Sequence, residues 1–227
     1  MIIISYNDNG TLKNSITYQN GIKDGPFEEY KNLFLFSKGT FKEGLKEGLY
    51  EEYFETGILK KRCYYENGKY NGKYYEYHSN GNIKINTTMI NGKIFGDYFK
   101  HYDSSLLEIS CRKENGTMCG FYTDFYENGK ERLTCNYKNG LIHGQIKEFD
   151  ENGEYKRIVN YKYGKFDGIY ERFDEHGLSM IKKFSNGKEI FIFDMTDFTF
   201  EERNQLSETV SKSYQQKRRK LINYNSI

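Results

Sequence analysis

Residues 67–81 read NGKYNGKYYEYHSNG, and residues 115–129 repeat their spacing of glycine and aromatic residues. One glycine of this stretch belongs to an unbroken row with a spacing of 24 residues, and we call the members of this row the anchor glycines. The anchor glycines are Gly48, Gly72, Gly96, Gly120, Gly144 and Gly168. A fixed period of this length is typical of arrays in which each unit is buried only by its neighbours. The sequence therefore predicts a repeat protein.

Two further glycine rows keep the same period, four residues before and nine residues after the anchor glycines. Many of these glycines follow Asn, as in Asn67-Gly68 and Asn80-Gly81. Asn-Gly supplies the two positive-φ residues of a tight hairpin turn, so two such turns per unit predict two strands per unit. We therefore expect an all-β fold: an elongated antiparallel β-hairpin array of about eight 24-residue units, with a C-terminal α-helix.

The period breaks at a few places. Residues 25–47 form a unit of 23 residues in which the apolar run LFLF (residues 33–36) replaces the central turn glycine, and Ser105 replaces another turn glycine. Gly187 closes the eighth unit one residue short. Because the regular places are explained by the repeat itself, a local function is expected where the repeat breaks.

Aromatic residues recur two and five places after the anchor glycines, as at Tyr50 and Tyr53. Strict alternation along a strand would put residues three apart on opposite faces. Either a bulge intervenes or both faces carry rings, and the pattern leaves both alternatives open. Like residues one repeat apart are expected to form supporting ladders across the sheet.

Three aromatic residues at more variable places are candidates for contact with a partner. Phe99 lies three places after its anchor glycine, and Tyr102 and Tyr126 lie six places after theirs. The same places become charged in the later units. Exposed aromatic clusters are common at interfaces, so we predict that Phe99, Tyr102 and Tyr126 bind a partner.

The positions of the cysteines argue against disulfide bonds and reactive thiols. Cys63, Cys111 and Cys135 all lie fifteen residues after an anchor glycine, which makes them a column. Strands two apart in a sheet are separated by roughly 9–10 Å, beyond the ~7 Å between Cα atoms that a disulfide bridges. We expect buried structural thiols here and at Cys119, consistent with a reducing compartment.

No pattern indicates an enzyme. The four histidines occupy different repeat places, and no Cys-x-x-Cys or His-x-x-x-His spacing is present. The glycines follow neither a Walker loop nor a dinucleotide fingerprint, because both need a helix after the glycine-rich turn. We therefore predict no catalytic residue, no metal and no cofactor.

The net charge and the lengths of the apolar stretches limit which kinds of partner and which cellular compartment are expected. The net charge is +2, from 34 basic and 32 acidic residues, so no global field favours nucleic acid. The apolar start, Met1 to Ile4, is too short for a signal peptide, and no stretch has the length of a membrane span. The expectation is a soluble cytoplasmic protein.

The last residues leave the period, which divides the chain into a repeat array (residues 1–190) and a tail (residues 191–227). Residues 191–194 are expected to add a last strand. Thr199 to Glu202 read as a capping box that opens a helix through about Leu221, expected to cover the last sheet edge.

Four basic residues near the end of this helix allow two interpretations. They either complement the helix dipole or bind nucleic acid, anionic lipid or an acidic protein. They are Lys217, Arg218, Arg219 and Lys220.

The glycine and aromatic places of residues 67–81 and 115–129 resemble the MORN-repeat variant of bacterial proteins, including YwqK-family antitoxins. The resemblance extends from residue 1 to about residue 190 and implies elongated antiparallel hairpins and interaction rather than catalysis. Three hypotheses follow: an inhibitor of antitoxin, immunity or anti-defence type that masks a partner protein, a structural or self-associating scaffold, or a lipid- or nucleic-acid-binding module. The sequence predicts no particular oligomeric state.

Overall fold

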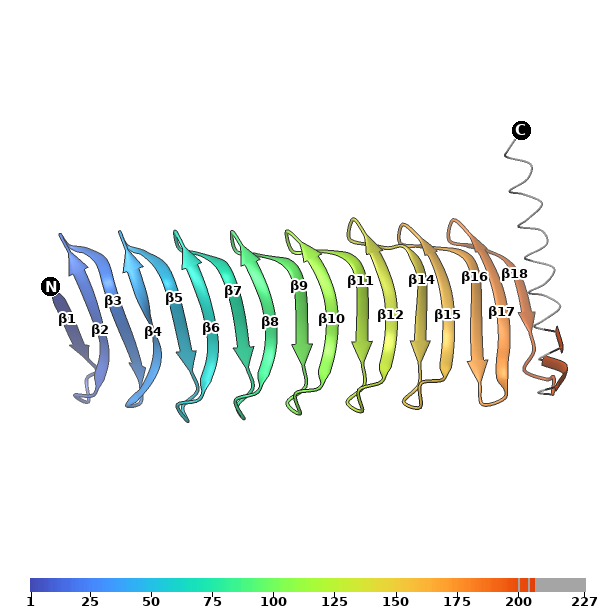
Figure 1. Ribbon diagram of the computed structural model, residues 1–227, viewed down its shortest axis with the longest axis horizontal. Coiled ribbons are helices and arrows are strands. Elements are labelled where there is room, and N and C mark those ends of the chain that lie inside the picture. Colours follow the sequence, from blue (N-terminus) through green and yellow to red (C-terminus); the bar gives the residue numbers. More distant parts are fainter. Residues whose placement is uncertain (200, 204, 207–227) are drawn as a thin grey trace, which may run out of the picture. The chain divides into compact units, whose positions relative to one another are not determined.

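The computed structural model describes residues 1–199, 201–203 and 205–206 (Figure 1). Contacts divide the chain into two units: unit 1 holds residues 1–131 and 137–140, and unit 2 holds residues 132–136 and the described residues from 141 onward. The strands of unit 1 are β1 (Ile2–Tyr6), β2 (Leu12–Gln19), β3 (Ile22–Lys31), β4 (Phe34–Lys42), β5 (Leu45–Tyr53), β6 (Leu59–Glu66), β7 (Lys69–Tyr77), β8 (Ile83–Ile90), β9 (Lys93–His101), β10 (Leu107–Glu114) and β11 (Thr117–Phe125).

Strand β12 (Glu131–Lys138) contributes residues to both units. The other strands of unit 2 are β13 (Leu141–Ile142), β14 (Gly144–Phe149), β15 (Tyr155–Lys162), β16 (Lys165–Asp174), β17 (Gly177–Ser185) and β18 (Lys188–Asp194).

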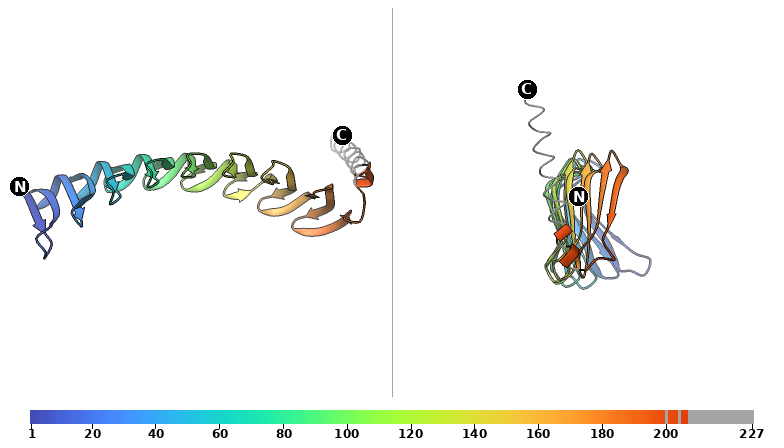
Figure 2. Two further views of the ribbon diagram at one scale, coloured as in Figure 1. Left: turned by 90° about the horizontal axis from the view of Figure 1, so that it is seen from below. Right: turned by 90° about the vertical axis from the view of Figure 1, so that its right-hand side faces the viewer.

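Each unit is an antiparallel array in chain order. In unit 1, every strand from β1 to β11 pairs with its neighbour in the chain, as Figure 2 also shows from two further directions. In unit 2, β12 pairs with β14, and the pairing continues from β14 to β18. The predicted all-β hairpin array is confirmed, and so is the last strand expected at residues 191–194.

The turns are of two kinds, one of them predicted correctly. At Asn67 and Gly68 both residues have positive φ, 49° and 76°, as a two-residue type I′ turn requires. The Gly68 N–H also donates to the Lys46 carbonyl of the preceding repeat, at 2.9 Å. The same bond recurs one repeat later between Gly92 and Tyr70, so these turns join neighbouring repeats.

In the second kind of turn, the expectation of two positive-φ residues is wrong. Gly81 has φ of 89°, but Asn80 is not among the positive-φ residues. The Gly81 N–H donates to the His78 carbonyl, and the His78 N–H donates to the Asn82 carbonyl. This is a longer loop, a type I turn closed by one left-handed residue, so only the glycine needs positive φ. The Asn80 side chain instead accepts a bond from the Asn82 N–H.

At both places where another residue replaces a turn glycine, that residue adopts the positive φ that glycine has in the other repeats. Ser105 has φ of 73°, and its N–H donates to the Tyr102 carbonyl as the turn glycines do in other repeats. Asn32 and Leu33 have φ of 47° and 74° and form a two-residue turn before β4. A left-handed residue other than glycine is strained, so Ser105 and Leu33 are local costs within unit 1.

The two alternatives for the aromatic places are both realised. The Tyr74 hydroxyl bonds Glu76 on one face, and the Tyr53 hydroxyl bonds Glu51 on the other. The β5–β6 pairing also shifts register between Glu52 and Tyr53. We call the face with Tyr50, Cys63 and Tyr74 the ring face and the face with Glu51 and Tyr53 the back face.

The core is a row of cross-strand partners on the ring face in which large and small residues alternate. Tyr50 pairs with Cys63, which pairs in turn with Tyr74, and Tyr74 pairs with Thr87, which pairs with Tyr98. Cys63 is 0% exposed and Thr87 3%. Because each of these two places lies between two rings, it accepts only a small side chain.

The cysteine column is confirmed, whereas the expectation for Cys119, outside the column, is wrong. Cys63, Cys111 and Cys135 are buried free thiols, and burial raises the pKa of Cys63 to about 11. Cys119 was also expected to be buried but is half-buried, because it lies next to the anchor glycine where the β10–β11 register shifts. The three buried thiols are therefore packing residues.

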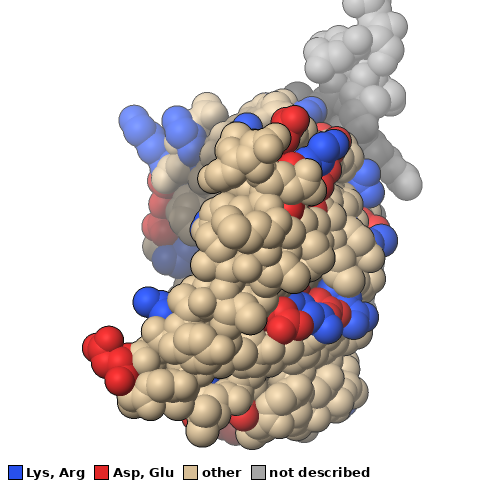
Figure 3. Space-filling model, turned by 90° about the vertical axis from the view of Figure 1, so that its left-hand side faces the viewer, with Lys and Arg blue, Asp and Glu red and all other residues tan. Residues whose placement is uncertain are grey.

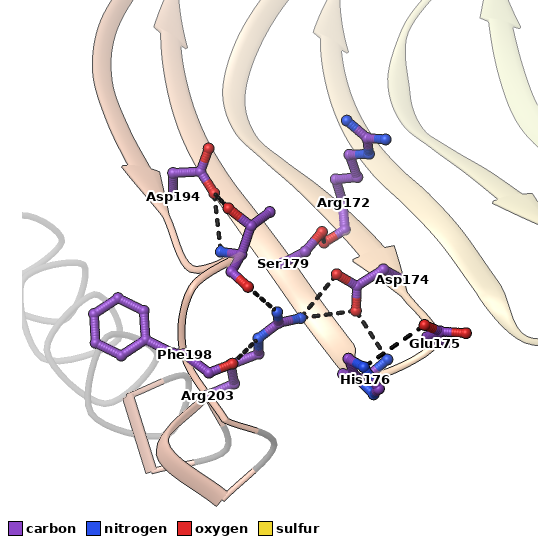
Figure 4. A network of polar contacts seen from close by, with 9 residues as sticks. Arg172, Asp174, Glu175, His176, Ser179, Asp194, Phe198 and Arg203 are labelled. Atoms are coloured by element: carbon purple, nitrogen blue, oxygen red, sulfur yellow. Dashed lines mark hydrogen bonds and ion pairs between the residues drawn. The ribbon is translucent and has the colours of Figure 1, made fainter.

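The start of the predicted tail helix is anchored on β16. Thr199 and Glu202 form the capping box: the Glu202 carboxylate accepts from the Thr199 N–H at 2.9 Å, and the Glu202 N–H donates to the Thr199 hydroxyl. Residues 201–203 and 205–206 are helical. The buried Arg203 guanidinium binds both carboxylate oxygens of Asp174, at 2.7 and 2.8 Å, and the Phe198 carbonyl (Figure 4).

The rest of the predicted helix, including Lys217 to Lys220, lies outside the described residues. The boundary at residue 190 and the covering of the last edge therefore stay predictions. Among the residues described, no helix has the length and apolar character needed to span a membrane.

Candidate protein-binding surface

A continuous chain of ring contacts covers the ring face of the early strands. Neighbouring rings along it have centroids between 4.6 and 6.4 Å apart. The rings are, in order of contact, Phe41, Phe27, Tyr50, Tyr65, Tyr70 and Tyr74. Within it, Tyr65 and Tyr70 are cross-strand partners and bridge from Tyr50 to Tyr74. We call them the bridging rings.

One repeat later, the bridging rings are missing. Met89 pairs with Gly72 and Ile94, as Tyr65 pairs with Gly48 and Tyr70, so Met89 and Ile94 occupy the equivalent places. These side chains fill the face less completely than two rings do. A groove of about 250 Å³ lies there, between Tyr74 and Tyr98.

The groove has an apolar floor. Ile85, Thr87, Met89 and Ile94 line it together with the rings of Tyr70, Tyr74 and Tyr98. The Thr87 hydroxyl already donates to the Asp97 carbonyl at 2.9 Å. The floor therefore presents mainly methyl and methylene groups.

A cation and a carboxylate complete the lining of the groove. The Lys113 Nζ atom lies 4.6 Å from the centroid of the Tyr98 ring. Glu76 accepts a 2.6 Å hydrogen bond from the Tyr74 hydroxyl. Burial, and then this bond, raise the pKa of Tyr74, so the phenol stays protonated and acts as a donor. The groove can hold an apolar or aromatic side chain with polar groups beside it.

The aromatic residues predicted to bind a partner lie elsewhere. Phe99 follows Tyr98 and is on the back face, opposite Asn86 and Ser110. Tyr102 and Tyr126 lie in equivalent turns one repeat apart, and the Tyr102 hydroxyl donates to the Phe125 carbonyl at 2.7 Å. All three side chains are half-buried, and none lines the groove.

Sequence reasoning missed the groove, although a signal was present. The place seventeen residues after the anchor glycine holds Tyr65, Tyr137 and Tyr161 but also Met89 and Lys113. Both exceptions line the groove. The loss of an aromatic residue from a regular place was therefore the informative feature.

The most buried carboxylates of unit 1 serve structure. Glu51 is 5% exposed and contacts Lys38 at 3.1 Å and Arg62 at 2.6 Å on the neighbouring strands. Burial alone would raise the pKa of Glu51, but hydrogen bonds from Tyr53, Arg62 and Lys38 outweigh it and the pKa is lowered. An ionised, fully paired carboxylate is a poor general acid.

No metal centre is evident in the part of the chain that the structure describes. No group of three or more His, Cys, Asp or Glu residues there is arranged to hold a metal ion.

A larger, polar hollow lies at the break in the second repeat. It has a volume of about 530 Å³ and is lined mainly by polar residues of the β1–β2 and β3–β4 turns, including Asn7, Asn9 and Asn32. Lys31, also in its lining, has its Nζ atom 3.5 Å from the centroid of the Phe36 ring. Because binding energy at protein interfaces concentrates in apolar and aromatic pockets, the groove on the ring face is the stronger candidate.

Comparison with known families agrees with the repeat architecture. Four segments match the MORN repeat variant: residues 2–20, 46–67, 70–94 and 142–163. These four segments are similar to the MORN repeat variant, which confirms that part of the predicted resemblance. Comparison with curated proteins found no match. The likeness to YwqK-family antitoxins and a bacterial source stay predictions.

Proposed function

We propose that the chain is a non-enzymatic repeat protein that binds another protein through the groove on the ring face of unit 1. The observation that carries this proposal is the loss of the bridging rings at Met89 and Ile94, which opens an apolar groove where the continuous ring contacts of the preceding strands end. Aromatic walls around an apolar floor are typical of the pockets that receive an anchoring side chain of a partner.

We further propose that the chain masks the bound protein and thereby inhibits it, as an antitoxin, immunity or anti-defence protein would. A repeat surface of this kind supports binding without any chemistry of its own. Phe99, Tyr102 and Tyr126 are proposed as a second contact region, on the back face and in the adjoining turns. The four free thiols suit a reducing compartment, so we place the protein in the cytoplasm.

The test compares two variants that add the same ring to opposite faces. Met89→Tyr restores a bridging ring and fills the groove, using the residue present at this place in other repeats. The control, Thr88→Tyr, adds a ring to the next residue, at the place where Tyr64 stands one repeat earlier. Both changes copy native repeats, so the fold should be kept.

Wild-type protein and both variants are used as bait in extract of the source cell, with quantitative mass spectrometry. We expect one protein captured in stoichiometric amount by the wild type and the control and lost with Met89→Tyr. Loss with Phe99→Ala instead would move the site to the back face. The purified partner is then assayed alone and in the complex, and full activity in the complex would contradict inhibition.

A further inference from the structure

The first strand of unit 1 has an unpaired edge. Among the described residues, β1 pairs with β2 alone. Met1 and Tyr18 exchange both backbone hydrogen bonds, at 2.7 and 2.8 Å. Hydrogen-bonded pairs alternate with non-bonded pairs in an antiparallel ladder, so Ile3 also bonds toward β2, whereas the N–H and C=O groups of Ile2 and Ile4 point away from it.

The side chains on this edge are apolar on both faces. Ile2 is 64% exposed, Ile4 53% and Ile3 41%. Residues 1–6 contain no charged side chain and no proline, the features that protect the edges of sheets from pairing. Figure 3 views unit 1 from the side of β1, and most of the surface nearest the viewer is uncharged.

The row of core residues on the ring face of unit 1 also ends at this edge. Ile3 pairs with Ile16, a member of the buried cluster on the ring face that is 7% exposed. Ile3 thus continues the core row but has no neighbour beyond it among the described residues. A strand added to this edge would cover Ile3 and prolong the row.

We propose that β1 pairs antiparallel with β1 of a second copy of this chain, with Ile3 at the two-fold axis. The run Ile2-Ile3-Ile4 reads the same in both directions, so this register sets isoleucine opposite isoleucine at all three places. Ile2 and Ile4 exchange backbone hydrogen bonds with their counterparts. The strand has no charged side chain that would be repelled by its own copy, and a closed two-fold contact ends at a dimer.

The first test measures mass by sedimentation equilibrium over a concentration series. We expect the wild type to associate to two chains. Ile4→Pro removes the outward N–H but leaves the bonds of Ile3 to β2, and proline is tolerated at such edge positions. Ile3→Lys places two like charges at the axis. Both variants should stay single chains at every concentration.

Phe121→Lys is the matched control, because Phe121 is an exposed apolar residue, 83% accessible, on another strand of unit 1. It should dimerise as the wild type does. Met89→Tyr should also dimerise, so this proposal stands or falls independently of partner binding. Circular dichroism establishes that each variant is folded.

A second test examines the register. Ile3 would face its own copy in a non-hydrogen-bonded pair with Cα atoms about 4.5 Å apart, which is within reach of a disulfide. Ile3→Cys should form a disulfide-linked dimer on mild oxidation, and Phe121→Cys should not. A wild type that stays a single chain, an association unaffected by Ile4→Pro, or growth beyond two chains would overturn the proposal.

Discussion

Strands β5–β7 and β8–β10 of unit 1 have the same backbone pattern and different surfaces. The register in which β6 pairs with β5 and β7 is repeated, one repeat later, where β8 pairs with β7 and β9. In β5–β7, Tyr65 and Tyr70 bridge the ring face, whereas in the second region Met89 and Ile94 leave a groove. The turns and the period thus maintain the backbone, while a few side chains decide whether the ring face is filled or open.

The back faces differ as well. Three residues after the anchor glycine, the first region has Glu51 between Lys38 and Arg62. The second region has Phe99 between Asn86 and Ser110. The first region is therefore held by packed rings and by the ion pairs of a buried carboxylate, and the second is more apolar and more open. We expect the first region to be the more stable and the more sensitive to acid.

Removal of an aromatic side chain should give the largest difference between the two regions in the loss of unfolding free energy. Tyr50 is 6% exposed and touches the rings of Phe27 and Tyr65, so Tyr50→Ala should lower the free energy of unfolding by about 3–5 kcal/mol. Tyr98 is half-buried beside the groove, and Tyr98→Ala should cost about 2 kcal/mol. Urea titration followed by circular dichroism measures both, and equal losses would contradict the comparison.

The buried carboxylate should give the next largest effect. Glu51→Gln removes the charge of a buried carboxylate whose partners, Lys38 and Arg62, are partly exposed, and should cost about 2 kcal/mol at neutral pH. Because the folded-state pKa of Glu51 is lowered, its contribution is present above the ordinary value of 4.5 and is lost as the pH falls through the folded-state pKa. The variant should therefore show a smaller loss of stability on acidification.

Glu108→Gln in the second region is the control for this change. Glu108 pairs with Lys100 and is more exposed than Glu51, so we expect a cost below about 1 kcal/mol. Urea titrations of both variants at several pH values decide the matter. An acid response of Glu51→Gln identical to that of the wild type would show that Glu51 is not the sensitive group.

Making the second region like the first should stabilise it. Met89→Tyr places a bridging ring between Tyr74 and Tyr98 and should raise the free energy of unfolding by about 1 kcal/mol, the scale of an aromatic pair. Thr88→Tyr, on the back face, should change it little. A loss of stability with Met89→Tyr would mean that the groove cannot receive a ring, and it would remove the basis of the binding test.

The smallest effect is expected at the turns. Ser105 in the second region holds the left-handed conformation that Gly57 holds in the first, at φ of 73° and 82°. Ser105→Gly relieves strain but adds freedom to the unfolded chain, so the net gain should be about 0.5 kcal/mol. The reciprocal change, Gly57→Ser, should cost a similar amount, and thermal unfolding measures both. An unchanged midpoint in both variants would rule out strain at this place.

The features predicted correctly from sequence are local or periodic ones. The anchor glycines, the Asn67-Gly68 type of turn and the Thr199 capping box depend on the φ preferences and hydrogen bonds of a few consecutive residues. The cysteine column followed from the period alone, since equivalent places repeat the same environment. The turns at Asn80 were misassigned because the same Asn-Gly pair fits two loops of different length.

The groove and the free edge of β1 follow from the folded structure, because both depend on residues far apart in the chain. Whether Met89 lies beside Ile94, or Ile3 continues the row of Ile16, is a matter of strand register and of what lies on the next strand. The period alone was enough to predict an array of hairpins with equivalent backbone conformations. Cross-strand packing decided which of its faces is filled and which is open, since a side chain acquires its neighbours only when the strands come together.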